Sequence, residues 1–315
     1  MLDATTGRPQ RISPSATFFG PLAVVTDNTT PWQIYMLDNV RSTNIGSTAN
    51  ALYQISSQNF ATATAIATKG TLGLKFPIAM VFSNGHLLIL DRGQQPDVAS
   101  APAIIDVTLS PLQVSSRRLT TVSEPLSMTI LPNGNLLIGD GRQQTAAQPA
   151  DIVQVDRSNN ASWVETSLLS LANPNPLIAP VGVVRQDDTH LFVVDLGLKG
   201  SLLPPASERA MAEAAAIYSI NRQQSPPTIT RASEQGTLVH PAGMLQNAQG
   251  TLYIVDQGEQ GTSTRAWRAT PHEFGVVVHF SSQRHTTTTE QNQIRQNIND
   301  IINQEKPAHT FMTMF

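Results

Sequence analysis

Five aspartates end apolar segments that recur along the chain, and they are the residues best suited to chemistry. They are Asp38, Asp91, Asp140, Asp195 and Asp256. Hard divalent cations prefer oxygen ligands, so five converging carboxylates would hold such a cation. Alternatively, each carboxylate accepts backbone N–H bonds within its own Asp-Gly turn. Because the aspartate recurs in every unit, the turn interpretation is the more economical, and we predict no bound metal and no cofactor.

Histidines and known catalytic motifs supply no further set of reactive groups. Among the seven histidines, His86 and His190 begin equivalent strands, His240 precedes a proline, and none has a partner at metal-ligand spacing. The sequence contains neither a Gly-x-Ser-x-Gly nucleophile elbow nor a phosphate-binding loop. We therefore predict no catalytic residue and a protein that is not an enzyme.

The aspartates belong to a sequence unit that occurs five times between Pro21 and about Thr270. Each unit opens with proline and a short apolar strand, crosses a polar turn, and continues through an apolar strand that ends in aspartate. The units open at Pro21, Pro77, Pro125, Pro180 and Pro241. Their prolines and aspartates are 17, 14, 15, 15 and 15 residues apart. Such constancy indicates one structural unit repeated along the chain.

The turns and later strands of each unit are typical of a β-propeller blade. Asn84-Gly85 and Asn133-Gly134 are strong hairpin signals between the first two strands. A third strand follows in every unit, least clearly at residues 266–269 in the last, and a polar fourth strand completes the first four units. The pattern predicts an all-β fold, a five-bladed β-propeller over residues 1–270, with six blades as the alternative.

The last unit lacks a fourth strand of its own. Residues 11–19, upstream of Pro21, have the strand-like pattern that the vacant place requires. We expect this N-terminal strand to complete the last blade and close the propeller, because closure removes exposed sheet edges.

The pattern changes after Thr270, and residues 271–315 are predicted to form a small β-α-β module. Residues 274–280 have the pattern of a buried strand, and a helix is expected from about 289 to 305 with one apolar face. So small a unit cannot bury enough apolar surface to be stable alone, so we expect it to dock onto another subunit. The residues expected to make this contact are Ile294, Ile298, Ile301, Ile302, Lys306, Pro307 and His309.

Composition narrows the classes of function. Charged residues make up 14% of the chain and its formal net charge is −3, with no basic stripe, which argues against a nucleic-acid partner. The absence of cysteine excludes disulfides and thiolate metal sites. Apolar runs are too short for a membrane helix, and the N-terminus lacks the apolar core of a secretory signal. We expect a cytoplasmic protein without membrane insertion.

Two family resemblances accompany these patterns. The repeats resemble NHL-type and gluconolactonase-like β-propellers in the Pro-x-Gly opening and in the apolar strand that ends in aspartate. This resemblance covers about 250 residues and implies a fold rather than a function, because such propellers include both enzymes and inert scaffolds.

The second resemblance concerns the C-terminus. Residues 301–310 read Ile-Ile-Asn-Gln-Glu-Lys-Pro-Ala-His-Thr and follow a strand that ends in Val278-His279-Phe280. Residues 274–315 resemble the C-terminal module of baseplate proteins of phage tail-like contractile injection systems. The resemblance implies a module for assembly with other subunits, present in several copies, and no catalytic role.

Together, these features predict a structural component of a phage tail-like contractile injection system, located at or near its baseplate. The propeller would then be an interaction platform. One alternative is a lactonase-type propeller hydrolase with a divalent cation on its axis. Another is a propeller that binds a ligand or glycan through its loops.

Overall fold

The computed structural model covers residues 1–315, and its described part consists almost entirely of β-strands. The described residues are 21–27, 33–38, 49–56, 59–93, 101–141, 150–159, 162–170, 175–197, 215–233, 238, 241–246, 252–256 and 275–279. Within these ranges the one helix is α1 (Lys69–Leu72). None of the described segments is a helix of the length and apolarity that crossing a bilayer requires.

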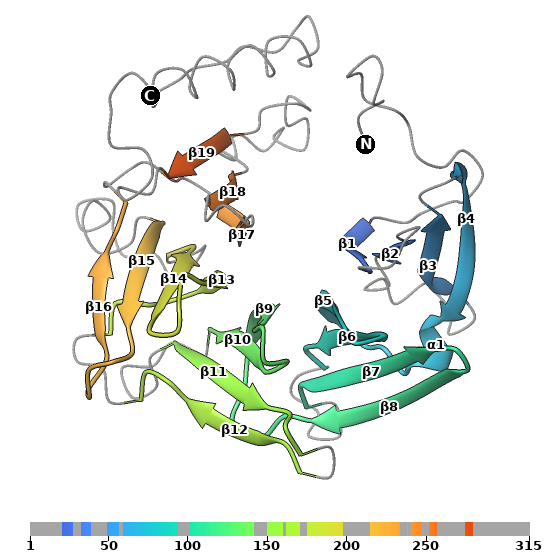
Figure 1. The fold of residues 1–315 in the computed structure, drawn as a ribbon, viewed down its shortest axis with the longest axis horizontal. Helices are drawn as coiled ribbons and strands as arrows, with labels where there is room; N and C mark the ends of the chain where they lie inside the picture. The colour runs from blue at the N-terminus through green and yellow to red at the C-terminus, as the bar shows by residue number, and fades with distance from the viewer. Residues whose placement is uncertain are drawn as a thin grey trace, which may run out of the picture. The chain divides into compact units, whose positions relative to one another are not determined.

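The chain divides into two compact units, the first comprising Arg11–Pro180 and Gln224–Pro227. It contains three four-stranded antiparallel sheets, each with its strands in sequence order (Figure 1). The first sheet consists of β1 (Pro21–Thr26), β2 (Gln33–Asp38), β3 (Asn50–Ser56) and β4 (Asn59–Thr68). The second consists of β5 (Pro77–Ser83), β6 (His86–Asp91), β7 (Ala103–Leu109) and β8 (Leu112–Arg118). The third consists of β9 (Pro125–Ile130), β10 (Leu136–Asp140), β11 (Asp151–Asp156) and β12 (Val164–Ser167).

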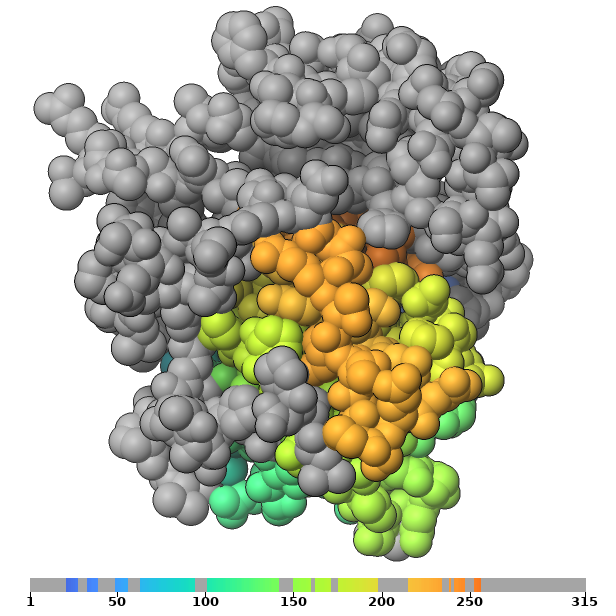
Figure 2. All heavy atoms as spheres, turned by 90° about the vertical axis from the view of Figure 1, so that its left-hand side faces the viewer, coloured from blue at the N-terminus to red at the C-terminus, as the bar shows by residue number. Residues whose placement is uncertain are grey.

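The second unit comprises Met1–Gln10, Val181–Gln223 and Thr228–Phe315, and its described residues form two sheets. One consists of β13 (Pro180–Arg185), β14 (His190–Asp195), β15 (Ala216–Asn221) and β16 (Thr228–Arg231). The other has three described strands, β17 (Pro241–Gln246), β18 (Leu252–Asp256) and β19 (Gly275–His279). The outer strands β15 and β16 lie at the surface in Figure 2, where they are orange.

The repeated proline and aspartate occupy fixed places in the first hairpin of a sheet. The register pairs Pro21 with Asp38, Pro77 with Asp91, Pro125 with Asp140 and Pro241 with Asp256. Proline has no N–H to donate to a ladder, so sheets accept it as the first residue of a strand. The constant spacing in the sequence is therefore the length of one hairpin, and it places these aspartates at the same end of each sheet.

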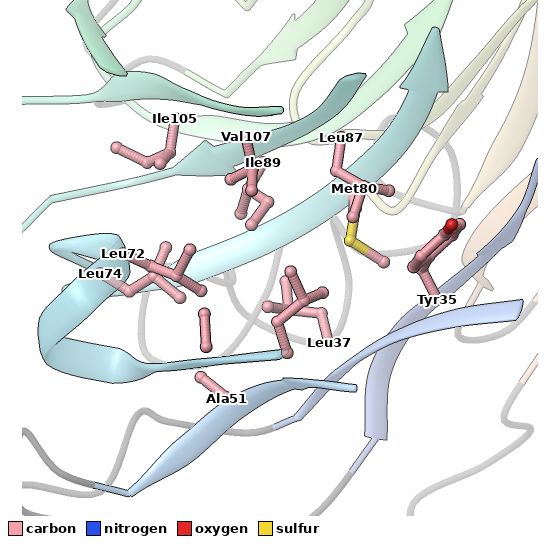
Figure 3. Close-up of a cluster of buried hydrophobic side chains, with 12 residues drawn as sticks. Tyr35, Leu37, Ala51, Leu72, Leu74, Met80, Leu87, Ile89, Ile105 and Val107 are labelled. Atoms are coloured by element: carbon pink, nitrogen blue, oxygen red, sulfur yellow. The ribbon is translucent and has the colours of Figure 1, made fainter. Parts of the chain in front are cut away.

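The cores of the first unit lie between consecutive sheets. One cluster joins the first two sheets and includes Tyr35, Leu37 and Met80, which are at most 5% exposed (Figure 3). A second cluster joins the second and third sheets and includes Leu88 and Ile138, both fully buried. Because the second sheet contributes to both clusters, its second strand, β6, is a continuous apolar run rather than an alternating one.

The all-β class and the four-stranded antiparallel sheets predicted from the repeat are confirmed. The third strands expected in the first four units correspond to β3, β7, β11 and β15, and the fourth strands to β4, β8, β12 and β16. Residues 11–19 and 289–305 lie outside the described ranges, so closure by the N-terminal strand and the C-terminal helix stay predictions. The choice between five and six blades also stays a prediction.

One strand assignment is wrong. The third place in the last sheet is taken by β19, which pairs antiparallel with β18 from Asp256↔Gly275 to Leu252↔His279. The sequence pattern predicts the third strand of the last sheet at residues 266–269 and a strand of the C-terminal module at residues 274–280. The physical reason is the run of valines at 276–278, since β-branched residues suit a pleated sheet and the edge of β18 offers a ladder.

Candidate functional site

The recurrent aspartates are buried at the ends of the second strands. Asp38, Asp91, Asp140 and Asp195 end β2, β6, β10 and β14 and are at most 3% exposed. Asp256 ends β18, and its side chain lies outside the described residues. A buried carboxylate is costly unless it is hydrogen-bonded, so the partners of these groups show their function.

Asp91 binds backbone on both sides of its hairpin. Its carboxylate accepts the N–H groups of Lys75 at 2.7 Å and Phe76 at 3.1 Å, just before β5. It also accepts the Gly93 N–H at 2.7 Å, two residues further along the chain. The Gly93 bond is the turn contact that the structural interpretation predicts. The other two bonds fasten the entry of the first strand to the end of the second.

Asp140 and Asp195 have the same kind of partner. Asp140 accepts from the N–H groups of Ser123 at 3.1 Å and Glu124 at 2.7 Å, and Asp195 accepts from Gly197 at 2.7 Å. These carboxylates are therefore engaged by backbone donors, and whether they also hold a cation stays a prediction. Within the described ranges, no three His, Asp or Glu side chains are placed to hold a metal ion.

The residues expected to dock the C-terminal module cannot be placed. Ile294, Ile298, Ile301, Ile302, Lys306, Pro307 and His309 all lie outside the described residues. The subunit partners inferred from them stay a prediction.

The second sheet contains a histidine–carboxylate pair that the sequence analysis did not recognise. His86 begins β6, Asp106 lies on β7, and the distance from His86 Nδ1 to Asp106 Oδ1 is 2.7 Å. The hydroxyl of Thr108 lies 3.4 Å from the same nitrogen. An ionised carboxylate can only accept, so Nδ1 carries the hydrogen in the neutral ring and Nε2 is left as the basic nitrogen.

The register of β6 and β7 shows which way this pair faces. His86 lies opposite Thr108, and Leu88 lies opposite Asp106, so all four residues share one face of the sheet. Leu88 belongs to the cluster that packs against the β9–β12 sheet. The pair therefore lies beside the interface of the second and third sheets, where the apolar core gives way to polar side chains.

An aromatic ring between two arginines borders the same interface. Trp163, just before β12, packs on the apolar cluster. The guanidinium carbons of Arg117 and Arg157 lie 4.9 and 5.1 Å from the centroid of its ring. Arg157 also donates from Nη1 to the Gly134 carbonyl at 3.0 Å. Cation–π contacts of about 0.5–2 kcal/mol each and this hydrogen bond fix the guanidinium groups in place.

Asp106 is the electrostatic link between His86 and Arg157. Burial lowers the pKa of the Arg157 guanidinium, and the negative charge of Asp106 partly offsets that by favouring the charged form. Arginine nevertheless stays protonated at any ordinary pH. The Asp106 carboxylate is thus close to a fixed positive charge while it holds the imidazole.

This geometry suits general-base catalysis. The His86 side chain is 39% exposed and that of Asp106 is 20% exposed, so water has access to the ring while the carboxylate orients it. A base held in one tautomer on a partly exposed ring can remove a proton from a water molecule. The arrangement can therefore activate water for attack on a carbonyl carbon.

The equivalent histidine of the β13–β14 hairpin has a local, structural partner. His190 Nδ1 lies 3.0 Å from Asp187 Oδ2, and Asp187 belongs to the turn that precedes it. The same carboxylate accepts the N–H groups of Thr189 and His190, both at 2.7 Å. Asp187 thus shapes its own turn. His86 differs because its carboxylate comes from another strand.

Asp187 gives a pH-dependent prediction. Partial burial raises the pKa of this carboxyl, but hydrogen bonds from Thr189 and His190 outweigh burial and hold it well below its usual 3.8. A depressed pKa stabilises the fold above the unfolded pKa, and this stabilisation is lost as pH falls through the folded one. Asp187→Asn should therefore lower Tm slightly at pH 7, and its difference from the wild type should shrink between pH 5 and pH 2. The carboxylate is 50% exposed, so screening keeps the effect below about 1 kcal/mol. A pH-independent difference would contradict this explanation.

The sequence contains a signal for the His86–Asp106 pair, but it is visible only once the pairing register of the second and third strands is known. Without that register, His86 is only the first residue of a strand. Asp106 interrupts the apolar third strand, and antiparallel pairing across β6 and β7 places it diagonally from His86. Diagonal neighbours on one face are within reach of long side chains. Pairing the second and third strands by their apolar alternation would have brought the two residues together.

Comparison with known proteins supports the fold. No family model matches the chain, and no curated protein matches its sequence. Solved structures that resemble it include the hydrazine synthase of Kuenenia stuttgartiensis, at a TM-score of 0.50 and 13% identity over 75% of this chain. That match spans 64% of the synthase chain, which is less than two thirds.

Two further structures are similar at lower scores. A gluconolactonase-like protein has a TM-score of 0.48 and 11% identity, covering 76% of this chain and 72% of its own. A luciferin-regenerating enzyme has a TM-score of 0.43 and 12% identity, and the match covers 77% of this chain and 71% of that enzyme's chain. The antiparallel sheets described above and the likeness at a TM-score of 0.50 support the all-β, propeller-like fold predicted from the repeat.

Two expectations from the sequence need correction. The structures that resemble the chain are named as enzymes or as gluconolactonase-like, which contradicts the expectation that it is not an enzyme. Nothing in the comparisons supports the resemblance to phage tail-like baseplate proteins. The named activities belong to the matched proteins, and at 11–13% identity the likeness establishes the fold alone.

Proposed function

We propose that this protein is a propeller hydrolase of the lactonase type, which opens a small cyclic ester with water activated by His86. The observation that carries the proposal is the 2.7 Å contact between His86 Nδ1 and Asp106 Oδ1 on a partly exposed face. It leaves Nε2 basic and reachable, which is the requirement for a general base.

The reaction follows from this geometry. His86 Nε2 takes a proton from water as the water oxygen bonds to the carbonyl carbon of the ester. The resulting imidazolium is stabilised by Asp106 at 2.7 Å. Collapse of the tetrahedral intermediate breaks the ring C–O bond, and the imidazolium returns its proton to the leaving alkoxide. The product is a hydroxy acid, which ionises at neutral pH and releases one proton per turnover.

A carboxylic ester suits this site better than an amide. Among the described residues, the Thr108 hydroxyl lies 3.4 Å from Nδ1, on the side held by Asp106. The geometry therefore favours activation of water over activation of a side-chain nucleophile. Water activated by one base is sufficient for an ester because alkoxides leave more readily than amines. Strain in a small lactone ring lowers the barrier further.

The test is a pH-stat assay of the purified protein with a panel of five- and six-membered lactones, with and without EDTA. We expect proton release above the protein-free rate for at least one lactone, unchanged by EDTA because no cation takes part in the proposed step. Absence of hydrolysis across the panel would contradict the hydrolase proposal. Loss of activity with EDTA, restored by a divalent cation, would replace the His86 mechanism with one centred on a cation.

A further inference from the structure

Two Asn-Gly dipeptides form the first turns of the second and third sheets, and they differ in how firmly they are bonded. They are Asn84-Gly85 and Asn133-Gly134, and the sequence contains no other Asn-Gly. Asparagine before glycine is prone to deamidation, because glycine has no side chain to hinder attack of its backbone nitrogen on the asparagine amide. The surroundings of each turn therefore decide whether this chemistry takes place in the folded protein.

The Asn84 turn is exposed and has few bonds of its own. Ser83 pairs directly with His86, so Asn84 and Gly85 form the whole loop between β5 and β6. Their φ angles are 50° and 83°, and positive φ at both central residues is a requirement of a type I′ turn. Both residues are exposed, and neither the Asn84 side chain nor the Gly85 N–H forms a hydrogen bond with another described residue. The attacking nitrogen and the amide that it attacks are thus both open to solvent.

The Asn133 turn is fastened at both of the reacting groups. Gly134 donates its N–H to the Leu131 carbonyl at 2.9 Å, and its own carbonyl accepts from Arg157 Nη1 at 3.0 Å. The side-chain oxygen of Asn133 accepts the N–H of Asn135 at 3.1 Å. The first of these bonds occupies the nitrogen that would attack, and the last occupies the amide that would be attacked. Deamidation there requires the turn to open first.

We propose that Asn84 is a site of spontaneous deamidation in the folded protein, whereas Asn133 is protected. The Gly85 nitrogen loses its proton and bonds to Asn84 Cγ, the bond from Cγ to the amide nitrogen breaks, and ammonia leaves with that proton. Water then opens the resulting succinimide ring. Cleavage between Cγ and the ring nitrogen gives aspartate, and cleavage between the backbone carbonyl carbon and the ring nitrogen gives isoaspartate. The net reaction converts one amide and one water into one carboxylic acid and ammonia.

The modification changes the hairpin that carries His86. In isoaspartate the backbone runs through the side-chain carbon, which lengthens a loop of only two residues between the paired Ser83 and His86. Either product also places a negative charge two residues before His86. The proposal is nevertheless independent of the catalytic one, because deamidation needs no substrate and is measured by mass.

Peptide mapping by mass spectrometry measures both sites while the full-length protein is incubated in mildly alkaline buffer, so each asparagine is the control for the other. In the folded protein we expect Asn84 to convert about tenfold faster than Asn133, because two hydrogen bonds of ordinary strength protect the latter. In denaturant the two rates should agree within a few-fold, because both asparagines precede glycine. Equal rates in the folded protein, or a faster rate at Asn133, would refute the proposal. So would a folded protein in which Asn84 stays intact over the time that the denatured chain needs to convert.

Two matched variants assign the modification to its residue. Deamidation replaces a neutral amide by a carboxylate, so aged wild-type protein should acquire an acidic form that isoelectric focusing separates. Asn84→Gln should suppress that form, because a glutamine amide must close a six-membered ring and does so far more slowly. Asn133→Gln should leave it unchanged. If the main acidic form persists in Asn84→Gln, the modification lies elsewhere in the chain and the proposal is overturned.

Discussion

Replacing His86 by glutamine is expected to lower kcat/KM for lactone hydrolysis by about 10²–10⁴-fold, the usual contribution of a general base. Glutamine can still donate a hydrogen bond to Asp106, but it has no basic nitrogen to accept a proton from water. The loss should appear in kcat more than in KM, because proton removal stabilises the transition state rather than the bound ester. Initial rates in the pH-stat give both constants.

His190→Gln is the matched control, because His190 begins β14 as His86 begins β6 and also pairs with an aspartate. It should retain the wild-type rate. Asp106→Asn should lower kcat/KM, because the asparagine no longer stabilises an imidazolium. The loss should be smaller than for His86→Gln, because the asparagine oxygen still accepts the hydrogen bond from Nδ1. Equal losses in His86→Gln and His190→Gln would indicate a structural effect of either histidine and remove His86 as the base.

The largest effect on stability is expected from Asp140→Ala. Asp140 is fully buried and accepts the N–H groups of Ser123 and Glu124. Leaving a buried donor without an acceptor costs about 1–3 kcal/mol, so two such donors predict a loss of about 2–6 kcal/mol in the free energy of unfolding. Chemical denaturation of wild type and variant, with the same m-value, measures it.

Two variants separate the causes of this loss. Asp140→Asn keeps one acceptor oxygen and removes the charge opposite Asp151. If hydrogen bonding dominates, Asp140→Asn should lower the free energy of unfolding less than Asp140→Ala does. Asp156→Ala removes an exposed-turn acceptor for Ser158 in the same sheet and should change stability little. If Asp140→Ala unfolds at the same denaturant concentration as Asp156→Ala, the carboxylate does not anchor the segment before β9.

The repeat alone was enough to predict most of the described fold. Proline at a strand start and aspartate at a strand end are local requirements, so their spacing reports one hairpin wherever it occurs. The turn bonds of Asp91 and Asp195 to glycines two residues later follow from the same local chemistry. Longer connections were less predictable, and β19 was assigned to another module because the repeat pattern changes after Thr270, in the connection between Asp256 and Gly275.

The candidate site depends on contacts that a linear pattern does not display. Asp106 meets His86 across a ladder, and Arg157 and Trp163 come from the next sheet. None of these residues belongs to a motif that marks a site. Their arrangement arises because the second and third sheets pack face to face, so residues from β6, β7 and β8 meet residues of the β11–β12 connection.

Rescue of His86→Ala by added imidazole is the most direct test of the central claim, that His86 supplies the base for ester hydrolysis. The alanine variant lacks the imidazole and retains Asp106 to orient a replacement. Its rate should rise with imidazole concentration and saturate, beyond the increase seen without protein, whereas His190→Ala should follow the protein-free background. A wild type that hydrolyses the lactone, together with a His86→Ala variant that is equally active or is not rescued by imidazole, would contradict the account.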